Sequence, residues 1–226
     1  MTNIGLAKAT FPDLSNEEFI ALAAETGFDF VSLRLCTSEA CRENDQILPG
    51  SAGLAAVQKA LQSTGLPVID LEFLTLTEKT RPEHWEWMFE VGEALGAKHL
   101  DGAGLLLDTL QLARFDETNL AADLKPYVGV IQLCDAPLAN PETTEELEFE
   151  ARYGRIPPGD GEIPIQQILS DIGPDVPVSI ECPNTALTES MGVRAYAQYL
   201  LERTNKMIAD TKFSSATHQR GVSRGK

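Results

Sequence analysis

Short apolar runs alternate along the chain with segments in which apolar residues recur at helical spacing. Glycine, proline and polar residues separate the two kinds of segment. This alternation is typical of βα units arranged around a parallel sheet. We therefore expect an α/β protein with about seven strands, over residues 4–7, 28–35, 66–74, 96–100, 104–108, 128–135 and 176–181.

The segments between these runs predict helices with clear start and stop signals. Ser15 and Glu18 have the spacing of a capping box, and Gly27 follows the last apolar position of the first helical segment. A second amphipathic segment stops before Gly65. Further helices are expected over residues 80–95, 117–124, 165–172 and 191–208, and a long polar loop is expected over residues 140–158.

The fourth and fifth apolar runs lie too close together for a regular βα repeat. Only Asp101, Gly102 and Ala103 separate residues 96–100 from residues 104–108. A crossover between parallel strands needs about a dozen residues or more. Either one βα unit is missing at this point, or the two runs form one strand.

The composition fits a single globular domain. The chain has 226 residues, of which 43% are hydrophobic and 23% are charged. We expect the domain to cover residues 1–209. Residues 210–226 are rich in serine and threonine and lack apolar periodicity, so we expect them to form a disordered tail.

The net charge and the cysteines limit the classes of partner and the cellular compartment that we expect. A net charge of −16 repels nucleic-acid backbones and anionic membrane surfaces, so we expect neither as a partner. No run reaches the roughly 20 apolar residues that span a bilayer, and the first residues do not resemble a signal peptide. The four cysteines form no CxxC pair, as expected of reduced thiols. These features predict a cytoplasmic protein.

Three of the expected strands carry, at or near their carboxyl ends, a polar residue that is able to hold a metal ion. These residues are Asp108, Gln132 and Glu181. The carboxyl ends of barrel strands are where α/β barrels place their catalytic groups. Glu72 also ends a strand, and it is a candidate substrate contact or replacement ligand. The pattern predicts an active site at this end of the strands.

Each of these residues also has a structural interpretation. Asp108 is placed to cap the following helix, because aspartate is a favoured N-cap residue. Gln132 is able to make a structural hydrogen bond inside the barrel. A buried Glu181 requires a paired charge or a metal ion. Glu72 is able to form a salt bridge at the barrel rim.

Three arginines are candidates for binding an anionic substrate group. Arg152 and Arg155 lie just before the PPGDG loop, and Arg114 follows Asp108. A guanidinium binds phosphate or carboxylate through forked hydrogen bonds. The alternative is that all three are solvated loop arginines.

A set of phrases in the chain resembles the xylose isomerase-like TIM-barrel superfamily, which contains sugar phosphate isomerases, epimerases and hydroxypyruvate isomerase-like proteins. In chain order the phrases are FDFVSLRL, VIDLEFLTLT, LLLDTLQLAR, VIQLCDAP, RIPPGDGEI and VSIECPN. The resemblance covers roughly residues 4–208, and its most specific part is the pair IQLCDAP and RYGRIPPGDGEI. It implies a TIM-type (βα) barrel.

The resemblance also implies a metal site that is incomplete in this chain. In such barrels one divalent cation is held by residues at the ends of strands 5, 6, 7 and 8. Asp108, Gln132 and Glu181 match the ligands of strands 6, 7 and 8. The strand 5 glutamate has no counterpart, because helix 4, strand 5 and helix 5 are absent between the fourth and fifth apolar runs. The barrel is therefore expected to be shortened.

The ligand types and the family together predict a reaction. Oxygen ligands without histidine favour Mg²⁺ or Mn²⁺. A divalent metal and a carboxylate base suit a sugar or sugar-phosphate isomerase or epimerase that works through an enediolate, with Glu181 and Glu72 as catalytic groups. The partner is then a small hydroxy-carbonyl compound. The alternative is an impaired or inactive relative that binds a small molecule or partner.

An incomplete barrel leaves two strand edges without a neighbour. Unpaired edges favour association with another chain, and dimerisation or strand exchange would cover them. A homo-oligomer is therefore a further expectation.

Overall fold

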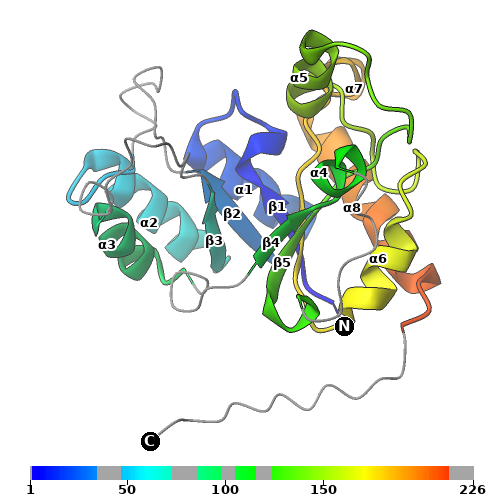
Figure 1. The fold of residues 1–226 in the computed structure, drawn as a ribbon. Coiled ribbons are helices and arrows are strands. Elements are labelled where there is room, and N and C mark those ends of the chain that lie inside the picture. The colour runs from blue at the N-terminus through cyan, green and yellow to red at the C-terminus, as the bar shows by residue number, and fades with distance from the viewer. Residues whose placement is uncertain (1, 35–46, 73–85, 98–104, 116–123, 214–226) are drawn as a thin grey trace, which may run out of the picture.

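The computed structural model describes residues 2–34, 47–72, 86–97, 105–115 and 124–213. These residues form a six-stranded sheet that curls into an open half-barrel with helices around it (Figure 1). All neighbouring strands are parallel, in the order β3-β2-β1-β6-β5-β4. The strands are β1 (Ile4–Ala7), β2 (Phe30–Arg34), β3 (Val68–Glu72), β4 (Leu105–Asp108), β5 (Val128–Leu133) and β6 (Val178–Ile180).

The helices pack against one another as well as against the sheet. Helix α1 packs against α2 and α8, and α8 also packs against α6 and α7. None of the helices in the described ranges is long and apolar enough to cross a membrane. The α-helices are α1 (Asn16–Thr26), α2 (Ala52–Thr64), α3 (Glu86–Leu95), α4 (Thr109–Arg114), α5 (Thr144–Tyr153), α6 (Ile165–Ile172), α7 (Thr185–Met191) and α8 (Val193–Asp210), with 3-10 turns at Lys8–Thr10 and Lys125–Tyr127.

The architecture is the shortened TIM-type barrel that the sequence predicts. Six of the seven expected strands are present in the described residues. The remaining run, over residues 96–100, falls mostly outside the described part of the chain, and so do most of the expected helix over 117–124 and most of the tail. The half-barrel brings the carboxyl ends of all six strands to one edge, which is where the candidate site lies.

The capping signals of the first helix are confirmed. The Ser15 hydroxyl accepts a hydrogen bond from the Glu18 backbone N–H at 3.2 Å, and the Glu18 carboxylate accepts one from the Ser15 N–H at 2.9 Å. Gly27 ends the helix with φ of 92°, a left-handed conformation that favours glycine. Thr80 and Glu83 also have the spacing of a capping box, at the start of the helix expected over residues 80–95, and they lie outside the described residues.

One expectation about the helices was wrong, and one further helix was not expected. The segment expected to be a polar loop contains helix α5, which Thr143 caps by accepting from the Glu146 N–H. The α5 segment is rich in glutamate and buries no side chain, so it lacks the apolar stripe that marks most helices. The last expected helix, over residues 191–208, is confirmed as α8, whereas α7, which ends at Met191 and is separated from α8 by Gly192, was not expected.

The packing of β1 beside β2 depends on a glycine. Gly5 of β1 pairs with Phe30 of β2, and a Cβ atom at position 5 would overlap the Phe30 ring. Phe30 is 1% exposed, so its ring has little room to move. The missing side chain of Gly5 therefore allows β1 and β2 to pack side by side.

We expect Gly5→Ala to lower the free energy of unfolding by about 1 to 3 kcal/mol, the usual cost of an overpacked core. Urea unfolding followed by circular dichroism measures this. Adding Phe30→Leu to the Gly5→Ala variant should recover part of the loss, because a smaller side chain makes room for the methyl group. If the single substitution has no effect, the close approach of Gly5 and Phe30 is not present in solution.

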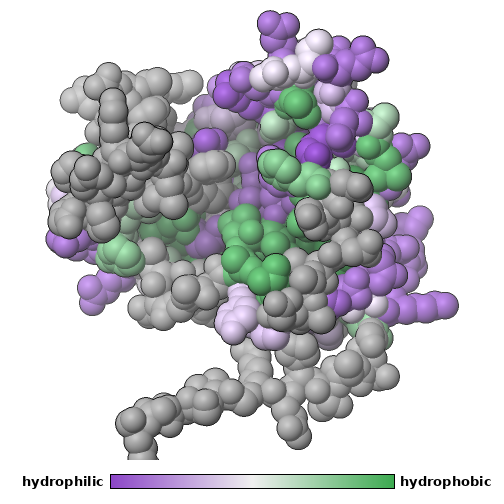
Figure 2. Space-filling model, viewed as in Figure 1, coloured by the Kyte–Doolittle hydropathy of each residue, from purple (hydrophilic) through white to green (hydrophobic). Residues whose placement is uncertain are grey.

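Strands β3 and β4 form the two ends of the described sheet. On β4, Leu105 and Leu106 are 39% and 43% exposed. Figure 2 shows a hydrophobic patch in the region of β4. The homo-oligomer expected from unpaired edges stays a prediction.

Candidate functional site

Polar side chains of three neighbouring strands gather at the carboxyl end of the sheet. Asp108 of β4 pairs with Gln132 of β5, and Gln132 pairs with Ser179 of β6. Glu181 follows two residues after Ser179, so we infer that it faces the same side of the sheet. The structure therefore brings the three residues expected from the sequence to adjacent strand ends.

The guanidinium of Arg155 lies between the carboxylates of Asp108 and Glu181. Its Nη1 donates to Asp108 Oδ2 at 2.8 Å, and its Nη2 lies 3.4 Å from Glu181 Oε1. Nη1 also donates to the Glu181 backbone oxygen at 3.3 Å, and Nε donates to the Ala151 backbone oxygen at 3.0 Å. Arg155 is 4% exposed, so these three residues form a buried charge cluster.

The backbone of Arg155 is fixed on both sides. Its N–H donates to the Pro183 carbonyl at 3.2 Å, and its carbonyl accepts from the Asn184 side chain at 2.8 Å. The next residue, Ile156, exchanges two backbone hydrogen bonds with Asp135, of 2.7 and 2.9 Å. The guanidinium therefore extends from a rigid segment that is tied to the ends of β5 and β6.

Asp135 organises the PPGDG loop that follows Arg155. It is 2% exposed, and each of its carboxylate oxygens accepts two backbone hydrogen bonds. Oδ1 accepts from Ala136 and Ile163, both at 2.9 Å, and Oδ2 accepts from Gly159 and Gly161, both at 3.0 Å. This role was not predicted, although an aspartate at the end of the strand expected over residues 128–135 was a visible signal.

Burial raises the pKa of Glu181 above its ordinary value. The Arg155 guanidinium opposes this shift in pKa, and the nearby Asp108 carboxylate adds to it. Arg34, at the end of β2, lowers the pKa of Glu181, and Asp70 of β3 raises it. Glu181 is 5% exposed, so its charge depends on these neighbours rather than on water.

One of the residues expected as metal ligands, Asp108, also has a structural role. Asp108 Oδ1 caps α4 by accepting from Leu110 at 2.8 Å and from Gln111 at 3.2 Å, which confirms its helix-capping interpretation. Gln132 is 5% exposed. Glu72 ends β3, where its backbone pairs with Arg34, and its side chain lies outside what the structure describes.

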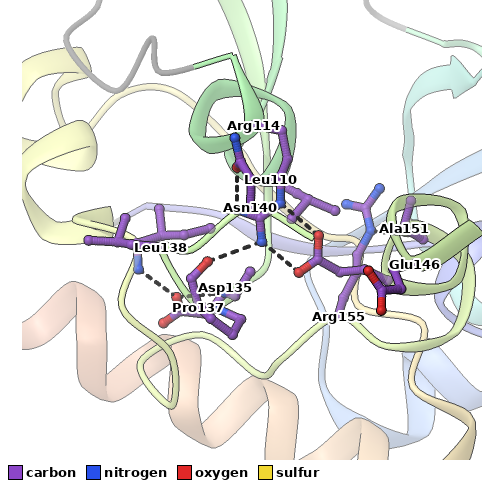
Figure 3. Close-up of polar contacts among 12 residues, drawn as sticks. Leu110, Arg114, Asp135, Pro137, Leu138, Asn140, Glu146, Ala151 and Arg155 are labelled. Carbon is purple, nitrogen blue, oxygen red and sulfur yellow. Dashed lines mark hydrogen bonds and ion pairs between the residues drawn. The ribbon is translucent and has the colours of Figure 1, made fainter. Parts of the chain in front are cut away.

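All three candidate arginines have acidic partners in the structure. Arg114 reaches from α4 to the Glu150 carboxylate of α5, with Nε at 2.7 Å, and it also donates to Asn140 at 3.2 Å and to the Pro137 carbonyl at 3.0 Å (Figure 3). Arg152 is a surface residue with a 66% exposed side chain, 3.8 Å from Glu148. Of the three, Arg155 alone contacts Asp108 and Glu181.

A second buried polar group, formed by Asp70, Ser32 and Ser179, was not predicted from the sequence. Asp70 Oδ1 accepts from the Ser32 hydroxyl, and the Ser32 and Ser179 hydroxyls are 2.9 Å apart. Asp70 Oδ2 has no hydrogen-bond partner among the described residues. Burial raises the pKa of Asp70 to about 6, and the Ser32 hydrogen bond opposes this. An ionisable residue within the apolar run of β3 was the signal for this group.

Asp70→Asn should make stability less sensitive to rising pH. A carboxyl with a pKa of about 6 when folded and an ordinary value of 3.8 binds its proton more tightly in the folded state. The contribution of this proton to the free energy of unfolding is complete below the ordinary pKa. It is lost as pH rises through the pKa of the folded state, and the total loss is about 3 kcal/mol. Asparagine does not ionise, so the variant avoids this loss.

Urea unfolding of both proteins at about pH 5 and about pH 8 tests this prediction. The stability of Asp70→Asn relative to the parent protein should rise by about 1.4 kcal/mol between the two values, because tenfold tighter proton binding is lost over that interval. Ser32→Ala removes the hydrogen bond that opposes the raised pKa and keeps the carboxyl, so its stability should be at least as sensitive to rising pH as that of the parent protein. If the free energy of unfolding changes with pH in the same way for Asp70→Asn and the parent protein, Asp70 has an ordinary pKa.

The expected ligand set does not fit a divalent cation in this arrangement. Both oxygens of Asp108 already accept hydrogen bonds, and Oε1 of Glu181 faces the Arg155 guanidinium. Within the described ranges, no group of three or more histidine, cysteine, aspartate or glutamate residues is arranged to hold a metal ion. Metal ligation by Asp108, Gln132 and Glu181 stays a prediction that the donor atoms do not support.

No protein-family model and no curated protein sequence matches the chain. Several solved structures do match it. A xylose isomerase domain protein from Salmonella typhimurium LT2 has a TM-score of 0.63 at 14% identity, over 92% of this chain and 96% of that one. A xylose isomerase domain protein from Alicyclobacillus acidocaldarius has a TM-score of 0.56 at 17% identity, over 92% and 99% of the two chains.

A third similar structure is a probable 3-DHS dehydratase from Bacillus anthracis, involved in petrobactin synthesis. Its TM-score is 0.58 at 13% identity, over 94% of this chain and 100% of that one. Identities this low establish the fold alone. The chain therefore has the fold of the xylose isomerase-like TIM barrels, in a shortened form with six strands in its described part.

Proposed function

We propose that this chain is an isomerase or epimerase that moves a proton at the carbon next to the carbonyl of a small polyhydroxy compound. The observation that carries the proposal is Glu181, a 5% exposed carboxylate that follows β6 and lies beside the guanidinium of Arg155. Burial raises the pKa of Glu181 above its ordinary value, so its carboxylate is a stronger base than an exposed one. A carboxylate of this kind is suited to proton transfer near pH 7.

The reaction needs a base and a group that stabilises negative charge. Glu181 would take the proton from the carbon next to the carbonyl, and the electron pair of that bond would move to the carbonyl oxygen. Return of the proton to the neighbouring carbon, with transfer of a hydroxyl proton between the two oxygens, completes an isomerisation. Return of a proton to the opposite face of the same carbon completes an epimerisation.

The charges favour an unphosphorylated substrate. Glu150 neutralises Arg114, and Asp108 and Glu181 offset the charge of Arg155. A phosphate at this site would face two buried carboxylates, and like charges in a buried site repel strongly. We therefore propose a neutral sugar or related hydroxy-carbonyl compound rather than a sugar phosphate.

Proton exchange with solvent tests the proposal. The protein is incubated in D₂O with a panel of aldoses, ketoses and their phosphates, and NMR follows the loss of the C–H signal next to the carbonyl. We expect exchange with at least one neutral sugar, and a rate about 10² to 10⁴ times lower in Glu181→Gln. Glu148→Gln, at a side chain that is 60% exposed, is the matched control and should leave the rate unchanged.

Equal exchange rates in Glu181→Gln and the parent protein would contradict the role of Glu181. If no compound exchanges but one binds saturably, the non-catalytic relative is the better description. Dehydration is a second candidate reaction, favoured by the similarity in fold to the probable 3-DHS dehydratase. It also begins with removal of a proton next to a carbonyl, and the same spectra would reveal it by the appearance of an alkene signal.

A further inference from the structure

The position between Asp108 and Glu181 contains a guanidinium held at hydrogen-bonding distances. The contacts of 2.8 Å and 3.4 Å join nitrogen to oxygen atoms, whereas Mg²⁺ or Mn²⁺ needs several oxygen atoms at about 2.0 to 2.6 Å. The two carboxylate side chains are 10% and 6% exposed. Two buried carboxylates require a compensating positive charge, and Arg155 supplies one.

The contacts of Arg155 also show that it is not a mobile surface side chain. Its Nε and Nη1 donate to two backbone oxygens and to Asp108, and its own backbone N–H and C=O are both hydrogen-bonded. A planar guanidinium keeps its charge at every physiological pH and presents several donors in a fixed geometry. The cation is therefore part of the protein and is held in place by the segment that follows α5.

We propose that Arg155 is a resident cation that replaces a divalent metal ion in this barrel and stabilises negative charge on the substrate oxygen. Among the described residues, the polar partner of Nη2 is Glu181 Oε1, and the second N–H group of Nη2 is able to donate to a substrate. The base and the charge-stabilising donor are then adjacent. The catalytic part of this inference rests on the proposed proton-transfer function, whereas the replacement of the metal ion does not.

Mn²⁺ titration of the complete protein tests the replacement, without any need for a substrate. Binding is followed by electron paramagnetic resonance and by the thermal midpoint Tm. The parent protein should show no saturable Mn²⁺ binding, and neither Mn²⁺ nor EDTA should change its Tm. In Arg155→Ala the freed carboxylates should bind Mn²⁺ and raise Tm by roughly 5 to 10 °C, at a Mn²⁺ concentration about 100 times the dissociation constant.

Two further variants make the titration specific. Adding Glu181→Gln to Arg155→Ala should abolish the gained Mn²⁺ binding, and Arg152→Ala, at an exposed arginine, should behave like the parent protein. Saturable Mn²⁺ binding by the parent that is lost in Glu181→Gln would overturn the proposal, and this comparison holds even if Arg155→Ala does not fold. A folded Arg155→Ala variant whose Tm does not change when Mn²⁺ is added would also overturn the proposal. Proton exchange is measured in a separate experiment. The replacement of the metal ion and the proton-transfer function are therefore tested independently.

Discussion

Replacing Arg155 with methionine is expected to lower the free energy of unfolding by about 3 to 5 kcal/mol, which is the usual cost of breaking a buried ion pair. Methionine fills much of the volume but leaves the carboxylates of Asp108 and Glu181 without their shared cation. It also leaves the Ala151 carbonyl without a donor. A typical domain has only 5 to 15 kcal/mol of stability, so this is a large fraction of the total.

Urea unfolding at neutral pH measures the effect, with Arg152→Met as the matched control. Arg152 precedes Arg155 by three residues, but its side chain is 66% exposed and its partner Glu148 is 60% exposed. The control should change stability by less than about 0.5 kcal/mol. Similar losses in the two variants would mean that Arg155 is solvated in solution and that the buried charge cluster does not form.

Replacing Asp135 with alanine is expected to lower the free energy of unfolding by about 3 kcal/mol or more. The substitution leaves the backbone N–H groups of Ala136, Gly159, Gly161 and Ile163 without their acceptor. An unsatisfied buried hydrogen-bonding group costs about 1 to 3 kcal/mol, although water would reach some of the exposed loop. Because the same residue pairs with Ile156, the loss should also loosen the segment that carries Arg155.

Hydrogen exchange and urea unfolding together test the role of Asp135. In Asp135→Ala, the amides of the PPGDG loop should exchange faster while those of β1 and β2 keep their relative protection. Asp175→Ala, at an exposed aspartate before β6, is the control and should alter neither quantity. If the loop amides exchange equally in Asp135→Ala and the parent protein, the carboxylate does not hold the loop.

Local signals in the sequence predict much of the fold. Ser15, Glu18 and Gly27 are enough to delimit α1, because capping acts over three or four residues. Apolar runs locate the six described strands. The same capping box at Thr143 and Glu146 was available for α5, but that helix buries no side chain and its composition is typical of a loop. The prediction was wrong there because it rested on apolar periodicity, which this helix lacks.

The candidate site was only partly predictable, because its main contacts are distant in sequence. Asp108, Gln132 and Glu181 were identified from strand ends, which a linear pattern shows. The contact between Asp108 and Arg155 joins residues that are 47 positions apart, and it depends on the path of the segment after α5. A linear pattern cannot show whether an arginine binds substrate or neutralises two carboxylates.

The Asp70 group was missed for a related reason. Its strand was classed by its apolar residues, and the polar residue within it received no role. The contacts of Asp70 with Ser32, and of Ser32 with Ser179, cross from β3 to β6 on the inside of the half-barrel. Only the strand order brings these residues together, and strand order depends on the complete topology.

The central claim is that Arg155 is the cation between Asp108 and Glu181, and a crystal structure from crystals soaked in Mn²⁺ tests it most directly. Mn²⁺ scatters anomalously, so a bound ion gives a distinct peak. We predict no anomalous peak between the two carboxylates, and the Arg155 guanidinium within hydrogen-bonding distance of both. An anomalous peak coordinated by Asp108, Gln132 and Glu181, with Arg155 displaced from the site, would contradict the claim.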